Sequence, residues 1–286
     1  MTVTYCPTSR DVVRVTGPDA LSYLQGQLSQ DLAALAPGEV AWSFVLAPQG
    51  KVDGWGRVLR VDGDTIQIDV DHGAGDAWDA RLRRFLLRTK AEISVTHDVA
   101  ALAIRGADVA GGLPCGWPGV VGVDLLGVGL ELGDEDDAAL VPSDLPSDAV
   151  EIDGTALEAL RIRAGVPRWG AELDTDTIPA TLGQWVIDAS VSFTKGCYTG
   201  QELVARIDSR GGHVPRRLAG VVIESGPAPA VGAAITVGGE PAGTITSAAP
   251  DDGRGAVALA FVPRSIDLPA DALVDGVAAH LKSLPL

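Results

Sequence analysis

The chain has 286 residues, enough for about two domains with a sizeable core. Its 38 acidic and 22 basic side chains give a formal charge of -16 at pH 7, which argues against duplex DNA or an anionic membrane surface as its main partner. The three cysteines, Cys6, Cys115 and Cys197, cannot build a disulfide framework, and none lies in a C-x-x-C pair. We therefore expect a protein of the reducing cytoplasm that holds no metal ion or iron–sulfur cluster of its own.

The sequence predicts neither a secretion signal nor a membrane span. Its first residues lack a basic start followed by an apolar run, so we expect no signal peptide. Residues 113–133 form the longest stretch with few charges, but prolines, glycines and Asp124 interrupt it. A membrane helix needs about 20 consecutive apolar residues, so we expect loops and short strands there instead.

The first hundred residues predict an α+β lobe. Alternating residues predict a strand at 11–16, and a helix follows it. One face of this helix carries the leucines Leu21, Leu24, Leu28, Leu32 and Leu35. The patterns next predict strands at 40–46, 52–61 and 65–70, a helix at 76–88 and a strand at 91–95. This order, βαβββαβ, predicts helices on one face of an antiparallel sheet.

The second half of the chain changes character twice. Short apolar runs at 99–132 predict strands without clear limits, and the acidic residues 131–151 lack compact ligand spacing, so we interpret them as solvated rather than as a metal site. Residues 155–164 predict a helix, and a long, mostly irregular segment at 165–207 follows it. Long ordered loops are often functional. After Pro215, short alternating runs split by glycine and proline predict a small β-barrel.

The most unusual segment is KGCYTGQE, residues 195–202, which we expect to face a central concave pocket. We take as candidate site residues Lys195, Gly196, Cys197, Tyr198, Gly200, Gln201 and Glu202. Lys195 would favour the thiolate of Cys197, and the two glycines would let the backbone approach a ligand or turn sharply. Gln201 or Glu202 would hydrogen-bond a ligand or anchor the loop. The alternative for Cys197 is a small buried hydrophobe, which is the commoner role of a cysteine.

KGCYTGQE resembles the signature of the YgfZ-type folate-binding family, which is related to the T-protein, the aminomethyltransferase of the glycine cleavage system. Three further segments resemble that family: YLQGQLSQD at 23–31, PQGK at 48–51 and LRIRAGVP at 160–167. The resemblance covers about residues 10–220, and the C-terminal β region fits the barrel domain of the family.

The resemblance implies an α+β, GcvT-like ring of two ferredoxin-like lobes and a C-terminal β-barrel around a central channel, where tetrahydrofolate or a derivative binds. We expect the first lobe at 1–97, the second lobe with the motif at 98–213, and the barrel at 214–286. Such proteins support the assembly or repair of iron–sulfur clusters in other enzymes. The resemblance therefore implies reduced folate and iron–sulfur client or assembly proteins as partners, with neither nucleic acid nor a membrane among them.

Two positions depart from the aminomethyltransferases. Their hairpin strand carries a catalytic aspartate beside the folate, and the matching positions here are Gly54 and Trp55, while Asp53 lies one residue early, on the opposite face of the strand. Relatives also tend to carry a glutamate that holds the pteridine where this chain has Arg163, and a guanidinium has only donors. Arg163 would meet a glutamate tail or another anionic ligand, or it would form an ion pair on its helix face.

Tryptophans offer flat surfaces for a pteridine. The candidates are Trp42, Trp55, Trp169 and Trp185, although core packing is the commoner role for each of them taken alone. We select Trp185 as a cofactor-binding candidate, because it lies in the loop that leads to the motif.

Three functions stay open. The first, which KGCYTGQE favours, is a tetrahydrofolate-binding accessory protein that supports iron–sulfur cluster assembly or repair, with Cys197 as its working thiol. The second is a folate-dependent aminomethyltransferase or another one-carbon transfer enzyme, which Gly54 and Trp55 disfavour. The third is a binding module for another anionic cofactor on the same scaffold, which Arg163 favours. Whether the chain is an enzyme stays open, because the matching catalytic aspartate is missing.

Overall fold

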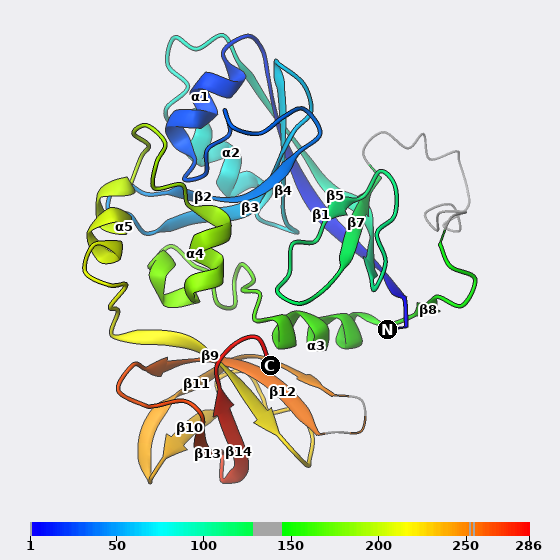
Figure 1. The fold of residues 1–286 in the computed structure, drawn as a ribbon, viewed down its shortest axis with the longest axis vertical. Helices are drawn as coiled ribbons and strands as arrows, with labels where there is room; N and C mark the ends of the chain where they lie inside the picture. The colour runs from blue at the N-terminus through cyan, green and yellow to red at the C-terminus, as the bar shows by residue number, and fades with distance from the viewer. Residues whose placement is uncertain (1, 128–144, 252, 254) are drawn as a thin grey trace.

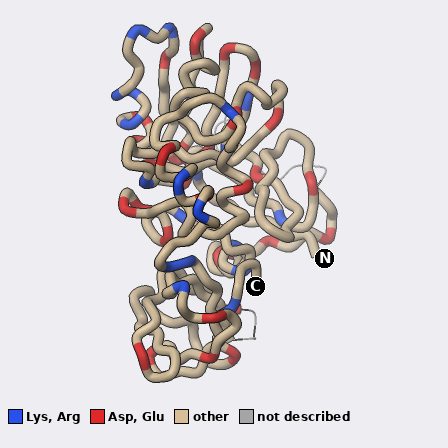
Figure 2. Tube along the Cα trace, turned by 60° about the vertical axis from the view of Figure 1, so that its left-hand side comes forward, with Lys and Arg blue, Asp and Glu red and all other residues tan. Residues whose placement is uncertain are grey.

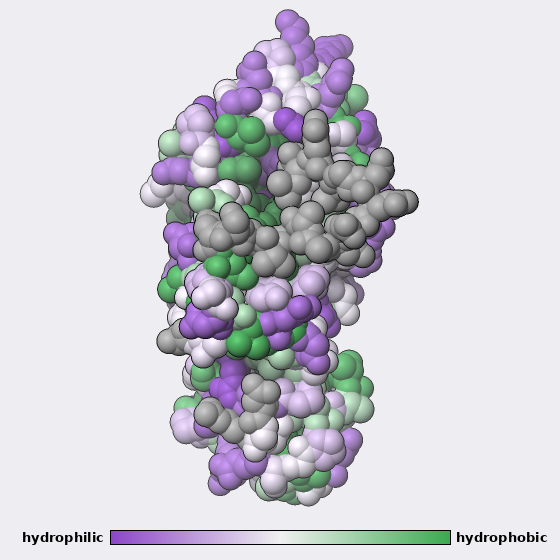
Figure 3. Space-filling view, turned by 90° about the vertical axis from the view of Figure 1, so that its right-hand side faces the viewer, coloured by the Kyte–Doolittle hydropathy of each residue, from purple (hydrophilic) through white to green (hydrophobic). Residues whose placement is uncertain are grey.

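The structure is a computed structural model that describes residues 2–127, 145–251, 253 and 255–286 (Figure 1). A larger α/β body lies above a small β-barrel in Figure 1, and the molecule narrows between the two in the view of Figure 3. Acidic positions occur in both parts and are mixed with basic ones along the trace (Figure 2). Most of the acidic stretch 131–151 lies outside the described residues.

One mixed sheet forms the frame of the body. Its strands are β1 (Thr4–Thr16), β2 (Val40–Leu46), β3 (Val52–Arg60), β4 (Thr65–Asp71), β5 (Glu92–Arg105), β6 (Leu113–Pro114), β7 (Gly122–Leu126) and β8 (Val150–Glu151). Among the described residues the order is β2-β3-β4-β1-β5-β7-β6, with β8 added in parallel to β1 and every other pair antiparallel. The predicted boundary at residues 97 and 98 falls inside β5, so strands of both predicted lobes share this sheet.

Two helices cover one face of this sheet, as the sequence predicts. They are α1 (Ala20–Gln27) and α2 (Gly75–Arg83). Leu24 of α1 and Trp78 of α2 are buried in one core with Val13, Ile66 and Ile68 of the sheet. Alternation placed these strand residues on the apolar face, and their burial holds both helices against it.

Helix α1 is shorter than the leucine spacing predicts. The helix ends at Gln27, and Leu28 is extended and bridges to Val45 of β2. The side chain of Gln25 accepts hydrogen bonds from the backbone N–H groups of Leu32 and Ala33, at 2.9 and 3.2 Å, which replace helical bonds. The leucines still reach the core, because the irregular segment after the helix keeps Leu28 and Leu32 fully buried.

Helix α2 also ends early, at Arg83 rather than near residue 88. Trp78 and Leu82 are buried as the spacing predicts, whereas Phe85 is partly exposed and Leu87 is 82% exposed. Arg88 adopts a left-handed backbone with φ of 58°, which a helix does not accept. Residues 85–87 therefore lie in a loop rather than in the helix, and from this loop Leu86 still packs against the core.

The segment predicted to be mostly irregular carries short helices. They are a 3₁₀ turn, η2 (Pro179–Leu182), and the helices α4 (Gln184–Ser190) and α5 (Gln201–Asp208). Before them lies α3 (Gly154–Ala164), which the sequence predicts almost to the residue. Asp153 caps α3 by accepting from the N–H of Ala156 at 2.8 Å, and Gly165 ends it with a left-handed φ of 74°.

The predicted C-terminal barrel is confirmed. Its strands are β9 (Arg216–Ile223), β10 (Ala234–Val237), β11 (Glu240–Pro250), β12 (Ala256–Pro263), β13 (Ala270–Val274) and β14 (Val277–Lys282). They close in the order β10-β11-β12-β9-β14-β13 around a core rich in alanine and valine. Helix α3 lies between this barrel and the body (Figure 1), since Ala159 and Ile162 pack against Leu218 and Val257 of the barrel.

Candidate functional site

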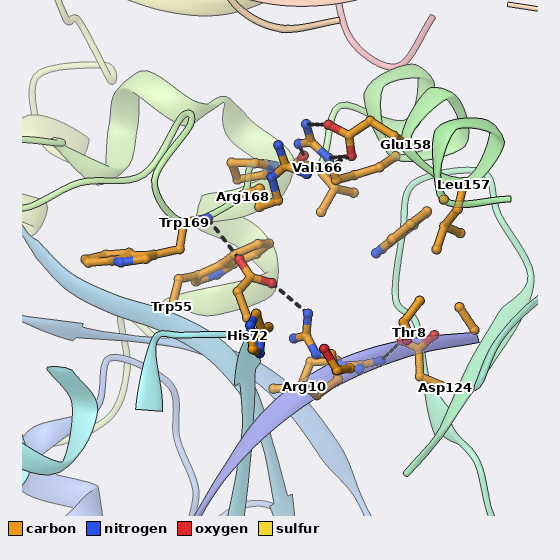
Figure 4. A pocket seen from close by; sticks show the side chains of 18 of the residues that line it. Thr8, Arg10, Trp55, His72, Asp124, Leu157, Glu158, Val166, Arg168 and Trp169 are labelled. Atoms are coloured by element: carbon orange, nitrogen blue, oxygen red, sulfur yellow. Dashed lines mark hydrogen bonds and ion pairs between the residues drawn. The ribbon is translucent and has the colours of Figure 1, made fainter. Parts of the chain in front are cut away.

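A cavity of about 460 Å³ lies where the sheet meets α3 and the loop that follows α3. Its walls come from β1, β2, β3, β4, β5, β7, α3, residues 166–169 and the loop residues His72 and Trp117. Figure 4 shows Trp55 and Trp169 at one end and Leu157, Glu158 and Asp124 toward the other. The volume lies within the range of small-molecule and cofactor sites.

Tryptophans form the apolar part of the cavity wall. Trp42, Trp55, Trp117 and Trp169 line it. Trp42 and Trp55 lie on the neighbouring strands β2 and β3, and their rings stack at 4.0 Å between centroids and 13° between planes. The indole N–H of Trp55 donates to Ser190 Oγ at 2.8 Å, which fixes the ring. Flat, fixed indoles are suited to a planar ligand.

A chain of alternating charges forms the floor of the cavity. Asp69 accepts from Arg10 and Arg57, both at 2.8 Å, and Asp124 pairs with Arg57 at 2.7 Å and with Arg105 at 2.8 Å. Burial alone would raise the pKa of Asp124, but Arg57 and Arg105 outweigh it and hold that pKa below its usual range. The carboxylate therefore stays ionised at neutral pH, and the floor is nearly neutral despite its many charges.

The α3 side of the cavity has a second charged group. Glu158 accepts from Arg161 through both oxygens, each at 2.8 Å, and lies 3.3 Å from Arg168. Burial would raise the pKa of Glu158, but its hydrogen bonds and attraction to Arg161 outweigh it and lower that pKa. At the opposite wall, Asp71 accepts from Arg10 at 2.6 Å and from the backbone N–H of Trp169 at 2.9 Å (Figure 4).

The residues 195–202 do not line this cavity. Cys197 is exposed, and Glu202 is exposed in the first turn of α5. Gln201 anchors the loop, because its side chain accepts from the N–H of Tyr198 at 3.1 Å. The motif thus lies outside this cavity, and Gln201 makes a hydrogen bond of the loop-anchoring kind; ligand binding by residues 195–202 stays a prediction.

Lys195 joins the motif to the end of α1. Its ammonium donates to the backbone carbonyls of Gln25, Leu28 and Gln30 at 2.7, 2.8 and 2.8 Å, and it lies 5.2 Å from the ring centroid of Tyr198. Burial lowers the pKa of Lys195 to about 8. An ammonium has three N–H donors, so the three carbonyls use all of them and leave none for the thiol of Cys197.

The two glycines of the motif differ. Gly200 has a left-handed φ of 84°, and a Cβ there would lie 2.5 Å from the carbonyl oxygen of Ala47. Gly50 lies in the turn of the β2–β3 hairpin and packs against the end of the motif and the start of α5. A Cβ on Gly50 would lie 2.5 Å from Cβ of Leu203. The resembling segments PQGK and KGCYTGQE thus pack against each other. Gly196 faces open space.

Arg163 and Trp185 also lie outside the cavity lining. Arg163 forms a two-bond ion pair with Asp251 of the barrel, one bond being 2.9 Å from Nε to Oδ1. Of the roles left open for Arg163, the ion pair is the one the structure contains, although its partner lies on the barrel. Trp185 packs edge-on against Trp55 at 6.2 Å, behind the cavity wall.

The positions that depart from the aminomethyltransferases lie on opposite faces of β3. Asp53 pairs with Arg81 of α2 at 2.9 Å, whereas Trp55 lines the cavity. A Cβ on Gly54 would lie 2.4 Å from Nε1 of Trp78, so packing against α2 accounts for the glycine. Regular alternation would put Asp53 on the same face as Trp55, two residues away. The β2–β3 pairing shifts register here, since Val45 pairs with Gly54 and Leu46 with Val52, and Asp53 is the extra residue that turns to α2.

Sequence reasoning missed the charged residues of the cavity. Those that line it are Arg10, Arg57, Asp71, Arg105, Asp124, Glu158, Arg161 and Arg168, and Asp69 pairs with two of these arginines beneath the lining. A signal was present, because Arg57 and Asp124 stand within short apolar strands, where a charge needs a buried partner. Which charge pairs with which depends on the sheet order, and the sequence does not give that order.

The described residues contain neither a cluster of metal ligands nor a membrane-spanning helix. No group of three or more histidine, cysteine, aspartate or glutamate side chains in this part of the chain is placed to hold a metal ion. No helix among the described residues is long and apolar enough to cross a membrane. The expectation that the protein holds no metal or cluster stays a prediction.

The architecture has a solved counterpart. The structure matches the glycine cleavage system aminomethyltransferase T from Bartonella henselae with a TM-score of 0.78 and 18% sequence identity, over 99% of this chain and 86% of that one. The fold is therefore that of the GcvT-like aminomethyltransferases, with an α+β body built on one mixed sheet and a closed C-terminal barrel.

Sequence relatives narrow the class to one family. The chain is 30% identical over 206 residues to an uncharacterized protein of Haemophilus influenzae, a match that covers 71% of this chain and 68% of that protein. It is 29% identical to the tRNA-modifying protein YgfZ of Edwardsiella ictaluri (70% and 65%) and 26% identical to that of Vibrio vulnificus strain YJ016 (90% and 82%). The chain belongs to the YgfZ-type family, which is related to the aminomethyltransferases.

The chain spans only about two thirds of the length of the first of these relatives. No family model matches the chain.

Proposed function

We propose that the protein is a tetrahydrofolate-binding accessory protein that supports the assembly or repair of iron–sulfur clusters in other proteins. The cavity carries this proposal, because it combines four tryptophans with guanidinium groups in a volume of about 460 Å³. A folate has a flat pterin ring and an anionic glutamyl tail, and the indoles and arginines offer complementary surfaces for the two. When bound, a tetrahydrofolate supplies a carrier for one-carbon groups.

The names of the relatives point to tRNA modification as the process that the proposed function serves. Those of Edwardsiella and Vibrio are called tRNA-modifying proteins. We propose that this chain serves tRNA modification through a modifying enzyme rather than by holding the RNA itself, because its formal charge of -16 opposes phosphate binding. Its three cysteines are free, which supports work in a reducing compartment such as the cytoplasm.

Cys197 is the proposed working thiol. It is exposed in a turn that Lys195 and Gln201 hold in place, so a partner protein can reach its sulfur. The other two thiols, Cys6 and Cys115, are buried. The proposed function thus uses two places on the molecule, a cavity for the folate and an exposed thiol outside the cavity.

Two alternative functions lose support. Aminomethyl transfer needs a free carboxylate beside the folate, but the carboxylates that line the cavity, Asp71, Asp124 and Glu158, are each paired with arginine. The other alternative, a binding module for a different anionic cofactor, depended on Arg163. The side chain of Arg163 already forms an ion pair with Asp251, so this alternative also loses its support.

Two experiments test the proposal. Titration with 5-formyltetrahydrofolate, followed by tryptophan fluorescence, is expected to quench or shift the emission of the cavity indoles. Complementation of a strain that lacks the protein is expected to fail with Cys197→Ala and to succeed with Cys6→Ala, a matched change at a thiol that is 2% exposed. Full complementation by Cys197→Ala would exclude the thiol as the working group, and absence of any folate binding would exclude the cavity assignment.

A further inference from the structure

Five guanidinium groups line the cavity, and four of them are held by short contacts with carboxylates. Arg57 and Arg105 share Asp124, Arg10 bonds Asp69 and Asp71, and Arg161 bonds Glu158. The side chains of these four are 2 to 20% exposed, whereas that of Arg168 is 48% exposed. Arg168 is therefore the cavity arginine that a ligand can reach most easily.

The donors of Arg168 are largely free. Its one ion pair within the described residues is a contact of 3.3 Å with Oε2 of Glu158, and its side chain donates no hydrogen bond to them. Both oxygens of Glu158 already accept from Arg161 at 2.8 Å. Glu158 is thus shared, and most of the planar donor fork of Arg168 has no acceptor within the described part of the chain.

The backbone around Arg168 is held firmly. Its N–H donates to Glu172 at 3.1 Å, and Glu172 is buried and accepts further bonds from Thr246 and Ser247 of the barrel at 2.7 and 2.6 Å. The next N–H, that of Trp169, donates to Asp71. Arg168 is thereby presented to the cavity from a fixed point, beside an indole of the cavity wall (Figure 4).

We propose that Arg168 binds a carboxylate of the cavity ligand and selects ligands that carry an anionic group next to a planar ring. The inference rests on the function proposed above, in which the ligand is a reduced folate and the carboxylate belongs to its glutamyl tail. In this arrangement Trp169 and Trp55 contact the pterin ring. Arg168 exchanges its weak contact with Glu158 for hydrogen bonds to the carboxylate of the ligand. Charge-assisted bonds of an arginine fork to a carboxylate are among the stronger hydrogen bonds in proteins.

The test is a double-mutant cycle between protein and ligand. The affinities of wild type, Arg168→Gln and Arg168→Lys are measured for 5-formyltetrahydrofolate and for its dimethyl ester, which lacks the tail charges. Arg84→Gln is the matched control, because Arg84 is exposed outside the cavity lining and loses the same charge. Melting curves of each variant verify that it is folded.

We expect wild type to bind the acid at least about tenfold more tightly than the ester, and Arg168→Gln to remove that preference without changing ester binding. Arg168→Lys keeps the charge without the fork and is expected to fall between the two. Equal binding of acid and ester by wild type, or equal weakening of both by Arg168→Gln, would overturn the inference but leave folate binding intact. Binding of neither ligand by wild type would overturn the proposed function and the inference together. Should neither Arg168 variant fold, the affinities of wild type for the acid and for the ester still test whether the protein recognises the carboxylates of the ligand.

Discussion

The indole of Trp55 stacks on that of Trp42 across neighbouring strands, with centroids 4.0 Å apart, and both rings line the same cavity. Trp42→Ala removes one ring of this pair, so we expect the affinity for 5-formyltetrahydrofolate to fall several-fold to about tenfold. Trp42→Phe keeps an aromatic face and is expected to retain most of the affinity. Calorimetric titration of both variants checks the expectation, and an unchanged affinity in Trp42→Ala would show that the ligand does not rest on this wall.

Lys195 is expected to contribute to stability rather than to thiol chemistry. Lys195→Met leaves three partly buried carbonyls without their donor, so the free energy of unfolding is expected to fall by roughly 2–4 kcal/mol. Urea unfolding measures this loss. The rate of alkylation of the exposed Cys197 in the folded protein is expected to stay within about twofold of wild type, because the ammonium has no donor left for the sulfur. A large change in that rate with unchanged stability would reverse the assignment.

Asp124 gives the protein a predictable acid response. The pKa of Asp124 is lowered in the folded state, so this group stabilises the fold above about pH 4, its unfolded value, and the stabilisation is lost as the pH falls through the lower folded pKa. Asp124→Asn leaves Arg57 and Arg105 short of a counter-charge and is expected to cost roughly 3–5 kcal/mol at pH 7.

Unfolding curves at pH 7, 5, 4 and 3 check the acid response of Asp124. The difference between wild type and Asp124→Asn is expected to narrow below about pH 4, where the carboxylate gains its proton in the unfolded chain while it is still ionised in the folded protein. Asp208→Asn, at an exposed position, serves as the control and is expected to change stability by less than about 0.5 kcal/mol. A difference that stays constant down to pH 3 would contradict the ionised state of Asp124.

The glycines of the motif offer a matched pair of substitutions. Gly200→Ala forces a Cβ to within 2.5 Å of the Ala47 carbonyl at a left-handed φ, so we expect a loss of roughly 1–3 kcal/mol. Gly196→Ala meets open space at an ordinary φ and is expected to be neutral within about 0.5 kcal/mol. Thermal unfolding of the two variants compares them directly. Equal losses in both would mean that the loop does not pack on the β2–β3 turn.

Much of the fold could be predicted from local patterns. Strand β2 is an apolar run, turns separate β2, β3 and β4, Asp153 caps α3, and glycine and proline divide the barrel strands, so the limits of these elements depend on near neighbours in sequence. The end of α1 depends on Gln25 and Lys195, and the contacts of Lys195 join residues more than 160 positions apart. No helical spacing rule includes such contacts, which is why the leucine pattern extended the helix too far.

The site was harder to predict for a related reason. Resemblance selected the residues 195–202, but their contacts are with α1 and the β2–β3 turn, not with the cavity. The cavity is built from side chains that are ordinary when taken singly, such as Trp42 or Arg57, and that become a site only when β1, β3 and β7 are brought together. The sequence motif thus identified the family but not the residues of the cavity, because those residues come together only through strand register and strand order.

Helix α3 has two working faces. On one face Ile162 packs against the barrel, and on the other Leu157 and Glu158 line the cavity. A ligand in the cavity therefore binds a wall that the barrel helps to hold rigid, and the barrel cannot detach without opening that wall. Amide protons of β11 and β12 should exchange more slowly with solvent when the cavity is filled, although they lie on the far side of the helix. The barrel would then report the occupancy of a site that it does not itself line.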